Sequence, residues 1–151
     1  MKDSLRIYVA SSWRNLYQPQ TVDFLRSLGH TVYDFRNPAP DGHAFRWSDL
    51  DPNLKSQQWS VETYVQMLEH PIAKQAYALD MKGLEEADLC ILLLPSGRSA
   101  SWEYGYHLGR FRRGGIVYMP EMAEPELMYS NSLFAGDLVS LRTAIDIWRM
   151  R

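Results

Sequence analysis

Two carboxylates draw attention because of the positions that the sequence pattern gives them. Glu103 follows a Gly/Ser loop and is expected in the first turn of a helix, where the helix dipole favours the ionised form. Asp80 is expected in the centre of the apolar stripe of another helix, where a carboxylate is costly unless it is hydrogen-bonded or functional. Two carboxylates in different environments are the pattern used to cleave glycosidic bonds, with the ionised one suited to the nucleophile.

Each carboxylate also has a purely structural interpretation. Asp80 could be hydrogen-bonded to backbone in the next loop. A capping-box role for Glu103 would need Ser or Thr three residues earlier, and position 100 is Ala. We therefore predict that Glu103 and Asp80 are catalytic.

The elements around Glu103 form a strand, a loop and a helix. The apolar run 89–94 predicts a strand buried on both faces, and the loop 95–99 follows it. From about Ala100 the spacing is helical, with Ala100, Tyr104, Leu108 and Phe111 on one face. In open α/β sheets, ligands bind outside the carboxyl ends of the strands, which is where this loop would lie.

The rest of the chain alternates between strand and helix patterns. This alternation predicts an α/β protein with about five parallel strands and right-handed crossovers, in a single domain spanning residues 1–151. Further strands are expected at 5–10, 30–35, 116–119 and 132–134, and helices at 19–28, 60–68 and 70–87. A single helical turn is expected at 126–129, and a last helix begins near Asp137 or Ser140, with Leu141, Ala144, Ile145 and Trp148 on its inner face.

The long polar connection 37–58 contains Phe45 and Trp47, and Trp59 follows it. A connection of this length in a small domain is often a lid or binding loop. Alternatively, its aromatic residues only fix the loop to the body of the protein.

Composition and motifs exclude several classes of function. The net charge of −2 without a basic run argues against binding of a nucleic-acid polymer. The G-x-G-x-x-G, P-loop and G-x-S-x-G motifs are absent, and no apolar run approaches the roughly 20 residues of a membrane span. We expect a soluble, cytoplasmic protein without a cofactor or metal, in which Cys90 is a core residue. The histidines have no metal-ligand spacing: His30, His43, His70 and His107.

Three blocks of the sequence resemble the nucleoside 2-deoxyribosyltransferase family, which includes the deoxynucleoside 5′-monophosphate N-hydrolases. The blocks read IYVASSW, LDMKGLEEADLCILLL and SGRSASWEYGYHLG. The resemblance implies a flavodoxin-like, Rossmann-like doubly wound fold with helices on both faces of the sheet. It also implies a Glu nucleophile that forms a covalent glycosyl-enzyme intermediate. By position, Glu103 would be the nucleophile, Asp80 would handle the leaving base and Tyr8 would orient the nucleophile.

Two positions depart from the family pattern. Gly97 stands where the transferases have Asp and the monophosphate hydrolases have Ser. Glu126 precedes the pair Leu127–Met128, where family members place an Asn or Ser that a neighbouring subunit lends to the site. The resemblance thus implies a homodimer or larger homo-oligomer. Arg98, Ser99 and Ser101 could hold a phosphate, whereas Glu126 would repel it. The predicted substrate-binding residues are Ser11, Ser12, Trp13, Gly97, Arg98, Ser99, Ser101, Glu126 and Met128.

The prediction for function is cleavage or transfer at the N-glycosidic bond of a (deoxy)nucleoside or a nucleoside 5′-monophosphate. One alternative is a glycohydrolase of NAD-type nucleotides, as in TIR-type domains, with the connection 37–58 covering the larger ligand. Another is a nucleotide sensor without catalysis.

Overall fold

The computed structural model describes residues 4–38, 44–53 and 58–151. They fall into two compact units, one made of the chain up to Asp34 and from Leu84 onward, the other of Phe35–Gly83. The first unit contains the sheet and the segments around Glu103.

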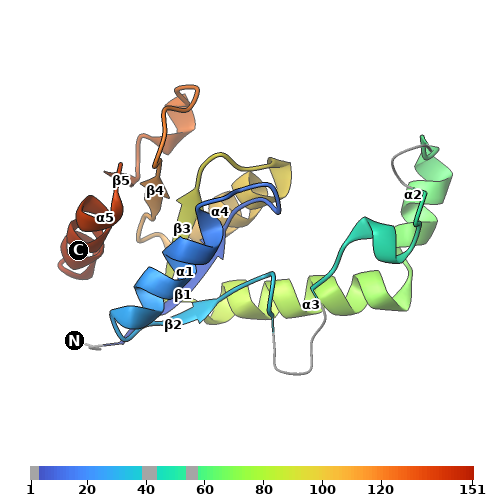
Figure 1. Ribbon diagram of the computed structural model, residues 1–151, viewed down its shortest axis with the longest axis horizontal. Coiled ribbons are helices and arrows are strands. Elements are labelled where there is room, and N and C mark those ends of the chain that lie inside the picture. Colours follow the sequence, from blue (N-terminus) through green and yellow to red (C-terminus); the bar gives the residue numbers. More distant parts are fainter. Residues whose placement is uncertain (1–3, 39–43, 54–57) are drawn as a thin grey trace. The chain divides into compact units, whose positions relative to one another are not determined.

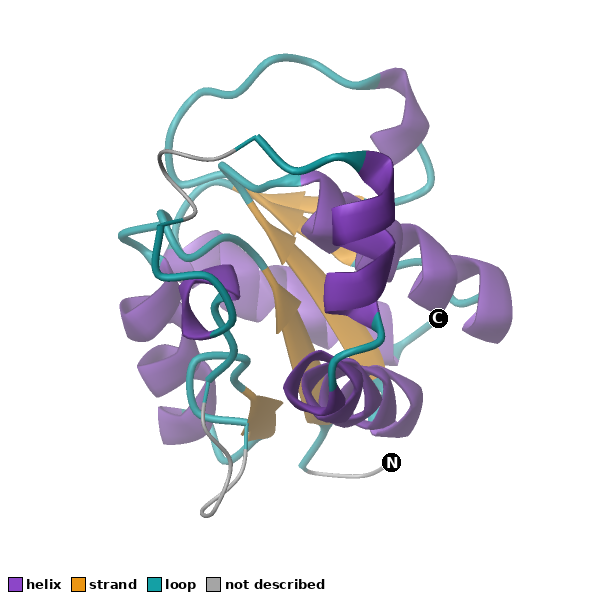
Figure 2. Cartoon of the chain, turned by 90° about the vertical axis from the view of Figure 1, so that its right-hand side faces the viewer, coloured by secondary structure: helices purple, strands orange, loops and turns teal. Residues whose placement is uncertain are grey.

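The sheet has five parallel strands in the order β2-β1-β3-β4-β5, shown as orange arrows in Figure 2. This confirms the predicted fold class. Four strands are shorter than predicted by one to three residues, because residues at their ends leave the hydrogen-bonded ladder, and the fifth is shifted by one residue. Their bounds are Arg6–Ala10 (β1), Thr31–Tyr33 (β2), Leu89–Leu93 (β3), Ile116–Tyr118 (β4) and Leu133–Ala135 (β5).

One face of the sheet packs against α1 (Gln18–Ser27) and α5 (Leu138–Arg149), as the labels in Figure 1 locate them. Alternate strand residues such as Ile7 and Val9 meet these helices in one buried cluster. The inner face of α5 is as predicted, and Asp137 caps the helix by accepting a hydrogen bond from the Ser140 amide (2.7 Å). The α5 residues in the cluster are Leu141, Ala144, Ile145 and Trp148.

The other face is covered by α4 (Arg98–Phe111), which packs on β1 and β3. Tyr8, Cys90 and Leu92 are buried outside the α1–α5 cluster and alternate with its members along the strands. Because successive strand residues point to opposite faces, these three side chains lie on the α4 face.

The start and the buried face of α4 correct two predictions. The helix begins at Arg98, so Glu103 is its sixth residue and lies in the second turn, not the first. The helix dipole acts mainly within the first turn, so it contributes less to Glu103 than we expected. The buried stripe continues from Ala100 and Tyr104 to His107, and Phe111 is 37% exposed. The buried imidazole of His107 is stabilised because its Nε2–H donates to the Ala87 carbonyl (3.1 Å).

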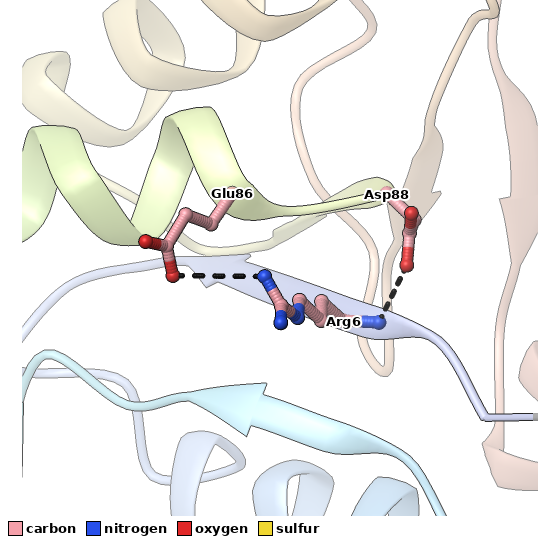
Figure 3. A network of polar contacts seen from close by, with 3 residues as sticks. All are labelled: Arg6, Glu86 and Asp88. Carbon is pink, nitrogen blue, oxygen red and sulfur yellow. Dashed lines mark hydrogen bonds and ion pairs between the residues drawn. The ribbon is translucent and has the colours of Figure 1, made fainter.

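Asp88 joins the opposite, amino ends of β1 and β3 (Figure 3). Its carboxylate accepts a hydrogen bond from the Arg6 amide (2.9 Å), and the Arg6 guanidinium lies 3.8 Å from Glu86. Asp88 therefore has a structural role.

The second unit contains η1 (Trp47–Asp49), α2 (Val61–Leu68) and most of α3 (Pro71–Glu86). Trp47 packs on three other aromatic rings of this unit, with ring centroids 5.0–6.0 Å apart, and the Trp59 indole N–H donates to Asp51 (2.8 Å). The aromatic residues near the 37–58 connection therefore form a small cluster with α2. Residues 39–43 and 54–57 of that connection lie outside the described residues, and its role as a lid stays a prediction. The three rings on which Trp47 packs are those of Phe45, Trp59 and Tyr64.

The helix α3 carries Asp80. Asp80 is half-buried, between the buried residues Ala73 and Leu84 of the same helix, and Tyr77 is 62% exposed. Tyr tolerates this exposure because its hydroxyl end is polar. Among the described helices of both units, none is long and apolar enough to cross a membrane.

Candidate active site

The candidate site lies where β1 and β3 end side by side. These strands are neighbours in the sheet, but α1 leaves β1 toward one face and α4 leaves β3 toward the other. Such a switch point is where open α/β sheets bind ligands. The loops 11–17 and 94–97 flank it, and the predicted residues Ser11, Ser12 and Trp13 lie in the first of these loops.

Tyr8 occupies the α4 face of the sheet beside this edge. It is paired in register with Cys90 and is 1% exposed. Its ring stacks on Tyr33 of the neighbouring strand, with centroids 5.1 Å apart and planes 8° apart. The stack and the burial hold Tyr8 in one orientation, as a residue that positions another group requires.

Glu103 reaches the same face from α4. Burial raises the pKa of the Cys90 thiol, and the charge of the Glu103 carboxylate raises it further, so that charge acts on the α4 face of the sheet. Cys90 is the strand partner of Tyr8, so the fold brings Tyr8 and Glu103 to one region of one face. Glu103 itself is half-buried, which suits a nucleophile that is partly shielded from water.

The start of α4 presents the predicted anion-binding residues. Gly97 is the N-cap in an extended conformation (φ −90°, ψ −176°), with no side-chain cap, and the first turn contains no acidic residue. Arg98 and Ser99 are exposed at this end. A helix start that lacks a side-chain cap and carries an arginine is a favourable environment for a phosphate.

Ser101 and the segment before β5 interact within this chain. Burial raises the pKa of Tyr129, whereas a side-chain hydrogen bond with Ser101 lowers it. Tyr129 of the turn η2 (Leu127–Tyr129) therefore lies near Ser101 of α4 in the same subunit. Leu127 and Met128 point outward and are 83% and 82% exposed, and Glu126 is exposed as well.

A comparison with solved structures finds a 2-deoxyribosyltransferase from the psychrotolerant bacterium Bacillus psychrosaccharolyticus. The TM-score is 0.60 at 21% sequence identity, and the match covers 89% of this chain and 88% of that one. The chain has the fold of a 2-deoxyribosyltransferase. No family model and no curated protein matches the sequence. The structural match agrees with the family resemblance of the three sequence blocks and confirms the flavodoxin-like sheet that it implied.

Asp80 belongs to the second unit, on α3, whereas Glu103 and Tyr8 belong to the first. Its role in handling the base stays a prediction. Among residues 4–38, 44–53 and 58–151, no group of three or more His, Cys, Asp or Glu side chains could hold a metal ion.

Our sequence reasoning missed Asn15, which joins the two loops of the site. The Asn15 amide is 1% exposed and donates to the Pro95 carbonyl (3.0 Å). Its oxygen accepts a hydrogen bond from the Tyr17 amide (2.8 Å). An Asn shortly before a helix start is a turn signal that could have been noticed, but its partner across the sheet is visible only in the structure.

Proposed function

We propose that this protein cleaves or transfers the N-glycosidic bond of a 2′-deoxynucleoside or a nucleoside 5′-monophosphate, with Glu103 as the nucleophile. The observation that carries the proposal is the position of Glu103, half-buried on α4, whose charge acts on Cys90, the strand partner of Tyr8, in the fold of a 2-deoxyribosyltransferase. The resemblance of the Glu103 block to that family supports the same assignment.

The reaction has two steps. A Glu103 carboxylate oxygen attacks C1′ of the sugar while the bond from C1′ to the base nitrogen breaks and its electron pair leaves with the base. Asp80 is the proposed donor of the proton that the departing base takes up. In the second step a water molecule or a second base attacks C1′ and releases Glu103, and the attacking group gives its proton back to the carboxylate of Asp80. Tyr8 holds the nucleophile in position.

A 5′-phosphate would bind at the start of α4. Arg98 supplies charge, and Ser99 and the first amide groups of the helix supply hydrogen bonds. Glu126 is the opposing feature, because a carboxylate at the site would repel the phosphate. Attraction of the phosphate by Arg98 and its repulsion by Glu126 thus together decide whether the substrate is a nucleoside or a nucleotide.

We also propose that the active form is a homodimer or larger homo-oligomer. The outward-facing Leu127 and Met128 suit an interface, because methionine is enriched there and the buried core of an interface is more apolar than its rim. The same turn would carry Glu126 to the site of a neighbouring subunit.

A panel of substrates tests the function. Purified protein is incubated with 2′-deoxynucleosides, 2′-deoxynucleoside 5′-monophosphates and NAD, each with and without a free acceptor base, and released and exchanged bases are quantified. We expect base release or exchange from the first two classes, and loss of both in Glu103→Gln. Release from NAD alone would favour the NAD-type glycohydrolase, and binding of substrates without release would favour the nucleotide sensor.

A further inference from the structure

We propose that Asn15 is a positioning residue that sets the distance between the β1 loop and the start of α4, and thereby positions Glu103 over the face of the sheet on which Tyr8 lies. This inference rests on the proposed function for its kinetic consequence. Its structural part, the cross-loop clamp, stands on the hydrogen bonds alone.

The clamp lies where the backbone pairing of β1 and β3 stops. The last paired residues are Ala10 and Leu92. Beyond these residues the two segments of the chain diverge, one toward α1 and the other toward α4. Their backbone groups therefore cannot continue the hydrogen-bonded ladder. The Leu93 carbonyl instead accepts a hydrogen bond from the Ser11 hydroxyl (3.0 Å), and the Asn15 amide lies 3.5 Å from it. Side chains therefore replace the ladder at this edge.

The Asn15 amide reaches further into the second loop than the Ser11 hydroxyl does. Its NH2 group donates to the Pro95 carbonyl (3.0 Å), 80 residues away in the sequence and shortly before the N-cap Gly97. The Asn15 side chain is buried, where a hydrogen bond is well defined and costly to break. Since α4 begins at Arg98, three residues after Pro95, this bond fixes the position of the first turn of α4 relative to the β1 loop. Glu103 lies in the next turn of the same helix, so its position depends on the bond as well.

The side-chain amide of Asn15 forms hydrogen bonds with backbone groups of both loops at once, because it has a donor and an acceptor. The Asn15 oxygen accepts from the Tyr17 amide (2.8 Å) and closes the local turn that starts α1, while the nitrogen donates across to Pro95. An aspartate would keep the local acceptor and lose the donor, leaving a carboxylate against carbonyl oxygens. The Asn15→Asp variant thus separates the cross-loop bond from the local turn, and Asn15→Ala removes both.

Asp88 provides a matched control. Its carboxylate also joins β1 to the β3 segment through a hydrogen bond from the Arg6 backbone amide (2.9 Å), but at the opposite end of these strands (Figure 3). Asp88→Ala therefore removes a comparable link far from the proposed site. Melting temperatures of all variants show whether the losses of stability are matched.

The first measurement is hydrogen exchange of the backbone amides, which needs no substrate. We expect Asn15→Asp and Asn15→Ala to exchange at least about 10-fold faster at residues 94–101, because the bond that holds this segment is lost, with the amides of α5 unchanged. Asp88→Ala should leave 94–101 as in the wild type. Wild-type exchange at 94–101 in Asn15→Asp would overturn the clamp.

The second measurement is base release by the folded variants. A misplaced nucleophile lowers turnover more than binding, so kcat should fall about 10- to 100-fold with a much smaller change in KM. The introduced carboxyl group can donate a hydrogen bond once it is protonated, so the rate of Asn15→Asp relative to wild type should rise as pH falls. Wild-type kcat in Asn15→Asp, with faster exchange, would overturn the positioning role. A wild-type protein that releases no base would overturn the proposed function, while the exchange result still decides on the clamp.

Discussion

The ring of Tyr104 fills the space in which a side chain at Gly115 would begin. A Cβ at position 115 would lie 2.5 Å from Tyr104 Cε2 and 2.9 Å from the Cys90 carbonyl oxygen. Tyr104 is itself fixed, because it is buried and its hydroxyl donates to the Ser132 hydroxyl (2.6 Å). The contact of α4 with the turn before β4 therefore depends on a glycine.

Gly115→Ala should lower the free energy of unfolding by about 1–3 kcal/mol, because neither the ring nor the strand backbone can move away cheaply. Gly109→Ala is the matched control. It lies inside α4, where an added Cβ meets no described atom within 4 Å, so the substitution should stabilise the protein by about 0.5–1 kcal/mol. Urea unfolding of the two variants and the wild type measures both changes in the free energy of unfolding. A Gly115→Ala variant as stable as Gly109→Ala would contradict the packing described for Tyr104.

Glu103→Gln should abolish base release, by roughly three orders of magnitude or more, since the amide cannot act as a nucleophile. The change keeps the shape of the side chain, so the melting temperature should change little. Glu85→Gln is a suitable control, because Glu85 is exposed and accepts a hydrogen bond from the Tyr106 hydroxyl on α4 (3.0 Å). Near wild-type turnover in Glu103→Gln would show that Glu103 is structural.

Asp80→Asn should slow base release strongly and leave substrate binding intact, because the amide keeps the shape but donates its protons poorly. The loss should be much smaller for a nucleoside with a cationic, N-methylated base, which leaves without prior protonation. A structural Asp80 predicts a different result: a lower melting temperature, with turnover per folded molecule unchanged and no dependence on the leaving base.

Mixing Glu103→Ala with Glu126→Ala tests the shared site, if each variant alone releases no base. If Glu126 enters a neighbour's site, Glu103→Ala and Glu126→Ala subunits should form mixed oligomers in which one site retains both residues. Base release should then return in part after subunit exchange. The alternative is that the 126–129 turn packs only on its own subunit, in which Tyr129 interacts with Ser101. Mixing that restores nothing while subunits exchange, or a monomer by light scattering at micromolar concentration, would rule out the shared site.

His107 should make the stability of the protein depend on pH. Burial lowers the pKa of His107 below its usual 6.5, while the Ala87 carbonyl and the charge of Asp88 raise it in part. A neutral imidazole in the folded state contributes its full stability above pH 6.5, and this contribution is lost as the pH falls toward the folded-state pKa, because the unfolded chain binds the proton first. The melting temperature should therefore fall on acidification through this range, and the fall should be smaller in His107→Gln.

The sequence alone determined the order of elements and much of their packing. The unbroken run 89–94 predicted the buried central strand, and the spacing of Leu141, Ile145 and Trp148 predicted the inner face of α5. These features are encoded locally, because side-chain periodicity and chain-order rules act over a few residues or one crossover.

Tertiary structure alone decided which groups meet at the candidate site. The start of α4 at Arg98 moved Glu103 to the second turn, and the register of β1 with β3 paired Tyr8 with Cys90. The bond from Asn15 to Pro95 spans 80 residues. No local pattern specifies such a partner, because it depends on how the two strands align and on where their backbones separate.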